Sequence, residues 1–163
     1  MSERVARLAV NLLRGPMYNA LPQDVQALFP QITDPIVTGN QDPVPNIVVG
    51  RYQDFGANAA AIIVTVDCAG PAESLVRQYR HLDLDVEVWV TSGQSPNVDG
   101  RRIASIIYEY IRRTLQDVNW SGNQISIQRS YETERSPILF EGQNKTYHIS
   151  SRYRVEAISQ VWY

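Results

Sequence analysis

The stretch TYHISSRYRVEAISQVWY, residues 146–163, alternates between apolar and polar side chains along most of its length. One parity holds Tyr147, Ile149, Tyr153, Val155, Ala157 and Val161, and the other holds His148, Ser150, Arg152, Arg154, Glu156 and Gln160. Successive side chains of a β-strand point to opposite faces of the sheet. The stretch therefore predicts one long strand, built into a sheet, with an apolar face and a polar face.

Two earlier segments predict strands that pair with each other as a hairpin. Residues 59–68 (AAAIIVTVDC) are apolar and rich in β-branched side chains, and residues 80–91 alternate without a break. The second segment has an apolar face made by Leu82, Leu84, Val86, Val88 and Val90. Its other face carries Asp83, Asp85, Glu87 and Trp89, which we expect to meet solvent or a partner. Shorter strands are expected at residues 46–50 and 124–129, the second followed by a polar excursion over 130–144.

Helical spacing appears in three segments. Residues 2–13 form an amphipathic pattern with Ser2 as N-cap, and Gly15-Pro16 is expected to end that helix. Residues 22–29 predict a second, short helix that begins at a proline. Residues 99–116 predict the longest helix. Its apolar stripe is Ile103, Ile107, Tyr110, Ile111 and Leu115, with Ile106 beside it.

These elements predict an α+β fold. Strands joined by hairpins give a mostly antiparallel sheet with a long β-hairpin, packed against one long helix and an N-terminal helix. A chain of 163 residues is expected to form a single domain, residues 1–163. Residues 30–45, rich in Pro, Gly, Asn and Asp, are expected to form a long loop.

Composition excludes several kinds of partner and site. The formal net charge is −2, from 15 basic and 17 acidic residues, which argues against non-specific nucleic-acid binding and against an anionic membrane surface. The single cysteine, Cys68, excludes an intramolecular disulfide and a multi-cysteine metal site. No stretch approaches the roughly 20 apolar residues that a membrane-spanning helix needs.

Catalytic motifs are also missing from the sequence. His81 and His148 lie in strand-like segments without metal-ligand spacing. The acidic run at Asp83, Asp85 and Glu87 is better explained as a solvated strand face than as a cation site. Residues 91–95 (TSGQS) lack the Gly-Lys-Ser/Thr end of a phosphate loop. We therefore assign no catalytic, cofactor-binding or metal-binding residues, expect no cofactor, and predict that the protein is not an enzyme.

Five segments follow one another in an order that matches a known group of proteins. They read Val5-Ala-Arg-Leu-Ala-Val-Asn-Leu-Leu, Pro45-Asn-Ile-Val-Val-Gly, Leu84-Asp-Val-Glu-Val-Trp-Val, Gly100-Arg-Arg-Ile-Ala-Ser-Ile-Ile-Tyr-Glu-Tyr-Ile and Thr146-Tyr-His-Ile-Ser-Ser-Arg-Tyr-Arg-Val-Glu-Ala. In this order the chain resembles the tail terminator and tail-completion proteins of long-tailed bacteriophages. That pattern overlaps with small minor capsid and neck proteins.

The resemblance implies a structural virion protein of the tail or neck, assembled in the host cytoplasm. Such proteins form a homo-oligomeric ring, commonly of six subunits, that caps the tail tube protein and joins it to the head connector. DNA passes through the lumen without specific binding, and no membrane is involved. A ring of this kind needs one patch to meet a different patch on the neighbour. Our candidates for such interface residues are Asp83, Asp85, Glu87, Trp89, Arg152, Arg154, Trp162 and Tyr163.

Two other classes of function remain open from the residues. A small ligand- or nucleotide-binding α+β enzyme would use residues 91–100 as an anion cradle at a helix N-terminus. A host adaptor module would add a peptide strand to the edge of the sheet and would stay monomeric.

Overall fold

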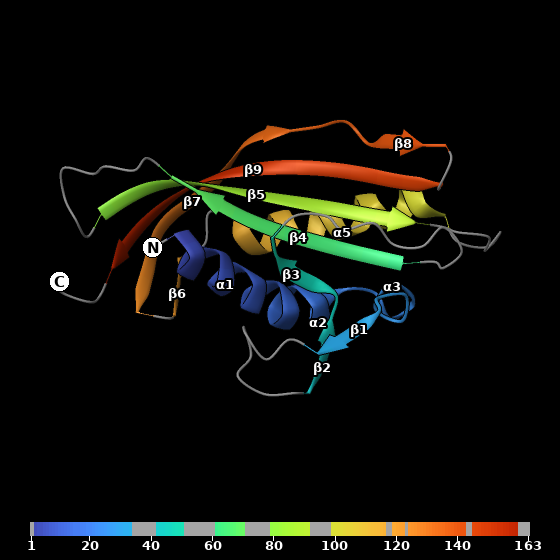
Figure 1. The fold of residues 1–163 in the computed structure, drawn as a ribbon, viewed down its shortest axis with the longest axis horizontal. Coiled ribbons are helices and arrows are strands. Elements are labelled where there is room, and N and C mark those ends of the chain that lie inside the picture. The colour runs from blue at the N-terminus through green and yellow to red at the C-terminus, as the bar shows by residue number, and fades with distance from the viewer. Residues whose placement is uncertain are drawn as a thin grey trace.

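Residues 146–159 of the alternating stretch form β9 (Thr146–Ser159), the longest of the described strands, inside the main sheet (Figure 1). The computed structural model describes residues 2–33, 42–50, 61–70, 79–91, 99–116, 119–122, 124–142 and 145–159. The strand order is β3-β4-β5-β9-β7-β6, and β8 also pairs with β9. These strands are β3 (Ile47–Val49), β4 (Ala61–Ala69), β5 (Tyr79–Thr91), β6 (Trp120–Gly122), β7 (Ile125–Arg135) and β8 (Leu139–Glu141).

The sheet is mostly antiparallel, as the sequence predicts. β4 and β5 form the expected hairpin, with Val66 opposite Val86, and β5 pairs with β9 along its whole length. The exception is β3, which runs parallel to β4. The short strand β6, which the sequence analysis missed, pairs with the start of β7. The predicted α+β class is confirmed.

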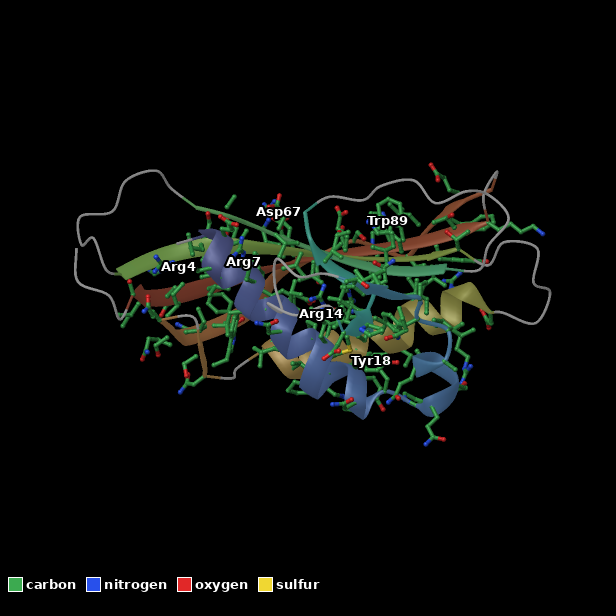
Figure 2. All side chains as sticks on the ribbon, turned by 60° about the horizontal axis from the view of Figure 1, so that its bottom comes forward. Arg4, Arg7, Arg14, Tyr18, Asp67 and Trp89 are labelled. Carbon is green, nitrogen blue, oxygen red and sulfur yellow. The ribbon has the colours of Figure 1, made fainter. Side chains whose placement is uncertain are left out.

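One long helix covers the sheet. α5 (Gly100–Leu115) begins after Asp99, whose carboxylate accepts a hydrogen bond from the Arg102 N–H at 3.2 Å. Four of the five residues of the predicted stripe are buried, but Tyr110 is only half-buried and Tyr108 is buried in its place. Figure 2 shows α1 and α5 on the same side of the sheet, so its other face carries no described helix.

The N-terminal helix does not stop where the sequence predicts. α1 (Ser2–Leu12) continues into a π-helical segment, η1 (Leu13–Met17), and then into α2 (Tyr18–Ala20). Pro16 lies inside η1, where the wider π turn accommodates a ring that would clash with the carbonyl four residues earlier in an α-helix. The prediction that Gly15-Pro16 ends the helix is therefore wrong.

The predicted loop over residues 30–45 contains secondary structure at both ends. α3 (Gln23–Gln26) precedes it, and β1 (Gln31–Thr33) pairs antiparallel with β2 (Pro43–Pro45) as a separate two-stranded sheet. Short strands that contain two prolines carry little periodicity, which is why the sequence pattern did not reveal them. Residues 34–41 lie outside the described part of the chain.

Most of the polar excursion predicted over residues 130–144 is also strand. β7 continues to Arg135 and pairs with β9, while β8 pairs with the start of β9. The register of β7 shifts twice, so that Gln128 and Thr133 are extra residues relative to β9. These shifts break the alternation of polar and apolar side chains, and the strand could not be read from periodicity beyond residue 129.

The core lies between the sheet and the two helices. Burial alternates along β9, where Ile149, Tyr153, Val155 and Ala157 are buried and the residues between them are partly exposed, except Ser151, which is also buried. The buried apolar residues of β9 pack with the inward residues of β4 and β5 and with the apolar stripes of α1 and α5 in one continuous cluster. No described helix combines the length and the apolar character that crossing a membrane requires.

Candidate functional site

The sheet face opposite the helices carries a ladder of ion pairs between β5 and β9. The register puts Asp83 opposite Arg154 and Asp85 opposite Arg152. Arg154 Nε lies 2.9 Å from Asp83 Oδ1, and Arg152 donates to both oxygens of Asp85 at 2.7 and 3.2 Å. Hydrogen bonding to Asp85 raises the pKa of Arg152, which is charged at every relevant pH. These side chains are 36–42% exposed, so solvent screens both pairs and each contributes little to stability.

A third strand extends the ladder. Glu134 of β7 lies opposite Arg152 of β9, with 3.9 Å between Glu134 Oε2 and Arg152 Nη1. The extra residue at Thr133 keeps Glu134 on this face; regular pairing from Glu132 would have turned it toward the helix. His81 and Glu156 form a further pair across β5 and β9, at 3.8 Å.

An aromatic pair lies at one end of the ladder. The rings of Trp89 and His148 are stacked, with centroids 3.7 Å apart and planes at 11°. Trp89 Nε1 donates to Glu87 Oε2 at 3.3 Å. Burial lowers the pKa of His148, outweighing Glu87 and Glu141, which favour the charged form. The imidazole is therefore neutral at neutral pH, and the pair is a flat, uncharged patch beside charged side chains.

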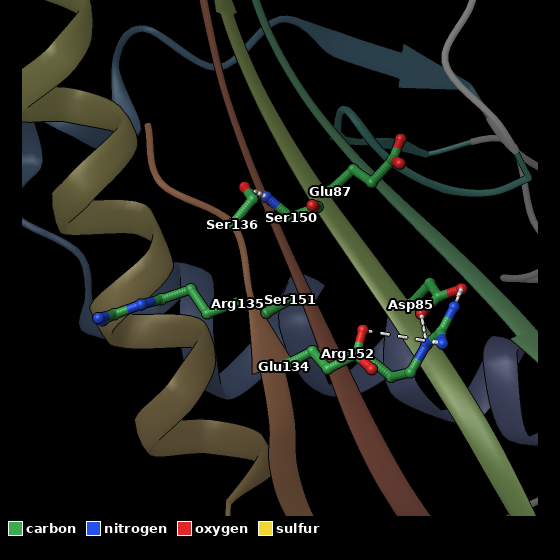
Figure 3. A pocket seen from close by; sticks show the side chains of 8 residues that line it. All are labelled: Asp85, Glu87, Glu134, Arg135, Ser136, Ser150, Ser151 and Arg152. Atoms are coloured by element: carbon green, nitrogen blue, oxygen red, sulfur yellow. Dashed lines mark hydrogen bonds and ion pairs between the residues drawn. The ribbon is translucent and has the colours of Figure 1, made fainter. Parts of the chain in front are cut away.

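A hollow with a volume of about 320 Å³ lies over β9 between β5 and the end of β7 (Figure 3). It is lined by Asp85, Glu87, Glu134, Arg135, Ser136, Ser150, Ser151 and Arg152. Three carboxylates therefore border it. Figure 3 shows Arg152 directed at Asp85 and Glu134, whereas Arg135 points to the other side, toward α5. Arg152 thus faces two of the three carboxylates, while Glu87 accepts hydrogen bonds from Thr65 and Trp89, and the acidic lining favours a cation.

Arg135 belongs to a separate cluster beneath the sheet. Tyr108 of α5 donates a hydrogen bond to Glu132, and the Arg135 guanidinium lies 5.4 Å from the centre of the Tyr108 ring. Burial and the bond to Glu132 raise the pKa of Tyr108 to about 12, so the phenol keeps its proton. This cluster ties α5 to β7, and nothing in it resembles an acid–base pair poised near neutral pH.

The described residues also bear on a metal site and on the predicted anion cradle. No group of three or more His, Cys, Asp or Glu side chains among them is placed to hold a metal ion. Asp99 caps α5 with its own carboxylate, which puts negative charge where an anion cradle would need positive potential. Residues 92–98, the rest of the predicted cradle, lie outside the described residues.

The structure gathers six of the eight candidate interface residues on one face: Asp83, Asp85, Glu87, Trp89, Arg152 and Arg154. The other two, Trp162 and Tyr163, lie outside the described residues. Asp67, Glu134, His148 and Glu156 lie on the same face but were not among the predicted interface residues, although His148 and Glu156 had been placed on the polar side of β9. The parity of β9 was sufficient to find His148 and Glu156, whereas the register shift in β7 hid Glu134.

A second candidate interaction surface, an apolar patch on β8, lies at the edge of the sheet. Leu139 and Phe140 of β8 are 50% and 56% exposed, and the Phe140 ring lies 4.8 Å from that of Tyr147. Exposed large apolar side chains on an edge strand are typical of interaction surfaces.

Comparisons with known proteins give a likeness of fold. No protein-family model matches the chain, and no curated protein matches its sequence. Among solved structures, the fold is similar to a chain in a structure described as "Virion of native gene transfer agent (GTA) particle", with a TM-score of 0.53 and 10% sequence identity. The similarity covers 97% of this chain and 96% of that chain. At this identity the likeness is one of fold, and it extends over nearly the whole of both chains.

Proposed function

We propose that this protein is a structural, non-enzymatic subunit of a phage-type virion. It forms a ring at the head–tail junction, where it terminates the tail tube and joins it to the head connector. The likeness in fold to a chain of a gene transfer agent particle, over nearly the full length of both, is the observation that carries the proposal. It agrees with the resemblance of the sequence to tail terminator proteins.

The surface of the molecule supports an assembling protein. The sheet face carries half-exposed ion pairs, an aromatic pair and no described covering helix, while β8 exposes Leu139 and Phe140. Interfaces are enriched in Trp, Tyr, Phe and Arg. The net charge of −2 suits a ring through which DNA passes without binding.

Deletion of the gene from the genome that encodes the protein tests the proposal. We expect heads and tails to accumulate unjoined, with tails of irregular length under the electron microscope, because no ring stops tail growth. A copy supplied from a plasmid restores joined particles. Particles of normal appearance and infectivity from the deletion strain would contradict the proposal.

The position within the particle is tested separately. A peptide tag, located by gold labelling, is expected at the junction of head and tail. Label along the tail tube or over the capsid would retain a virion role and reject the junction.

A further inference from the structure

We propose that the face of the sheet that carries the ladder docks onto the outer face of α5 in a second copy of this chain. The proposal deepens the ring described above and rests on it for its biological setting. It identifies which two surfaces meet, and it follows from their charges, their positions and the hollow between β5 and β7.

The acidic sheet face comprises the outward charged residues of β4, β5, β7 and β9. Its six carboxylates belong to Asp67, Asp83, Asp85, Glu87, Glu134 and Glu156, and its three guanidinium groups to Arg129, Arg152 and Arg154. Six negative and three positive groups give a formal net charge of −3 with neutral histidines. The neutral Trp89–His148 stack lies within this face.

The basic helix face is the exposed side of α5. It carries Arg101, Arg102, Arg112 and Arg113, and one carboxylate, Glu109, which gives a net charge of +3. Half-buried Ile106 and Tyr110 lie among them, and the Arg113 guanidinium lies 5.2 Å from the centre of the Tyr110 ring. Each face thus combines aromatic or apolar side chains with charge, and the net charges of the two faces are opposite in sign.

Charge complementarity of this kind steers association and selects the partner. The hollow adds a specific binding position, because three carboxylates border it and Arg152 pairs with only two of them, Asp85 and Glu134, which leaves acceptor capacity for another guanidinium. An arginine of the neighbouring α5 supplies that group, and its planar guanidinium suits paired carboxylate recognition.

The positions of the two faces determine the kind of assembly. α5 lies beneath the sheet and the ladder lies on the opposite side, so the two faces of one molecule point away from each other (Figure 2). A patch that meets a different patch produces head-to-tail association, which closes into a ring or grows as a filament. A symmetric pair of sheet faces is disfavoured because it brings two net charges of −3 together.

Reversing the charge of each face tests the docking. Variant one, Glu87→Lys with Glu134→Lys, makes the hollow basic. Variant two, Arg101→Glu with Arg112→Glu, makes the helix acidic; these positions are eleven residues apart and share a side of the helix. Arg101→Glu puts a negative charge near the N-terminus of α5 and stabilises the helix, whereas Arg112→Glu puts one near the C-terminus and destabilises it. The two effects oppose each other, so we expect the fold to be little affected.

Sedimentation velocity at matched concentration is the measurement. Each variant alone is expected to self-associate at least about tenfold more weakly than the wild type, because like charges meet. An equimolar mixture of the two variants is expected to recover wild-type association, because the sheet of one then meets the helix of the other. Circular dichroism confirms folding, and Glu87→Gln with Glu134→Gln provides a milder variant that keeps the hydrogen-bond acceptors. Glu3→Lys, on α1, serves as the control for added positive charge.

Wild-type association in either reversed variant, or failure of the mixture to recover it, would overturn the docking. A wild-type chain that stays monomeric at all concentrations would overturn it as well. The proposed function fails on other observations: normal particles from the deletion strain, or label away from the head–tail junction. A protein located at that junction, with unchanged association of the variants, rejects this interface and leaves the function intact.

Discussion

At the scale of single residues, the structure assigns two titratable side chains to unreactive environments. Cys68 and His148 are the residue types from which a nucleophile or a proton carrier is made. Burial raises the pKa of the Cys68 thiol to about 12, with Asp67 and Asp83 acting in the same direction, and burial lowers the pKa of His148. Both groups are therefore held neutral, as suits a packing role.

The Cys68 thiol is expected to react slowly in the folded protein. A raised pKa reduces the thiolate fraction, so alkylation by iodoacetamide near pH 8 should be at least about tenfold slower than in the unfolded chain. Because the thiol has a pKa of about 12 when folded and an ordinary value of 9.0, unfolding releases its proton between these pH values, and stability falls as pH rises through this window. Cys68→Ala is expected to flatten that fall. Equal alkylation rates in folded and unfolded protein would contradict the expected burial.

His148 is expected to take up its proton only below its ordinary pKa of 6.5. The unfolded chain then binds the proton more readily, so His148 lowers stability as pH falls below about 6.5. Proton NMR of the imidazole signals, assigned with His148→Gln, measures the midpoint. A midpoint above 6.5 would mean that the Trp89 ring and the nearby carboxylates stabilise the imidazolium after all.

At the scale of elements, α5 and β9 behave as their sequences predict, whereas α1 and β7 do not. The stripe of α5 and the alternation of β9 are long patterns with few exceptions, Tyr110 and Ser151 among them, and burial enforces them. The helix continues past Pro16 through a π turn, and β7 shifts register twice against β9. Both features depend on tertiary packing, which the local residue pattern does not predict.

Two adjacent isoleucines of α5 differ in burial, and truncating each one tests which face of the helix packs against the sheet. Ile107 is fully buried and Ile106 is half-buried on the outer side. Ile107→Ala is expected to lower the free energy of unfolding by roughly 2–5 kcal/mol, because it leaves a cavity under the sheet. Ile106→Ala should cost about 1 kcal/mol. Urea unfolding measures both, and similar losses for the two variants would mean that α5 does not cover the sheet through Ile107.

At the scale of the whole molecule, the fold segregates opposite charges onto opposite sides. A net charge of −2 conceals this, since composition averages an acidic sheet face and a basic helix face. Segregation of this kind favours head-to-tail association over pairing of identical faces.

Self-association of the wild-type chain is therefore expected to weaken with salt. Raising the salt concentration from about 0.05 M to about 0.5 M shortens the range of the interaction between the faces by about threefold. Light scattering across this range should report smaller species at high salt. Phe140→Ser is the matched control, and it should retain the same salt dependence. Association that strengthens with salt would instead indicate that the apolar patch on β8 drives it.

The residue pattern alone predicts the α+β class, the β4–β5 hairpin, the long strand β9, the covering helix α5 and the outward side of β5. The buried face of a strand repeats every two residues and that of a helix every 3.6 residues. Such a repeat can be recognised within a short segment of sequence. The parallel pairing of β3 with β4, the extension of β7 to Arg135 and the place of Glu134 in the ladder could be learned only from the tertiary structure. It also decided that the acidic and basic residues lie on opposite sides. These features depend on register and on which strands become neighbours, and long-range packing sets both.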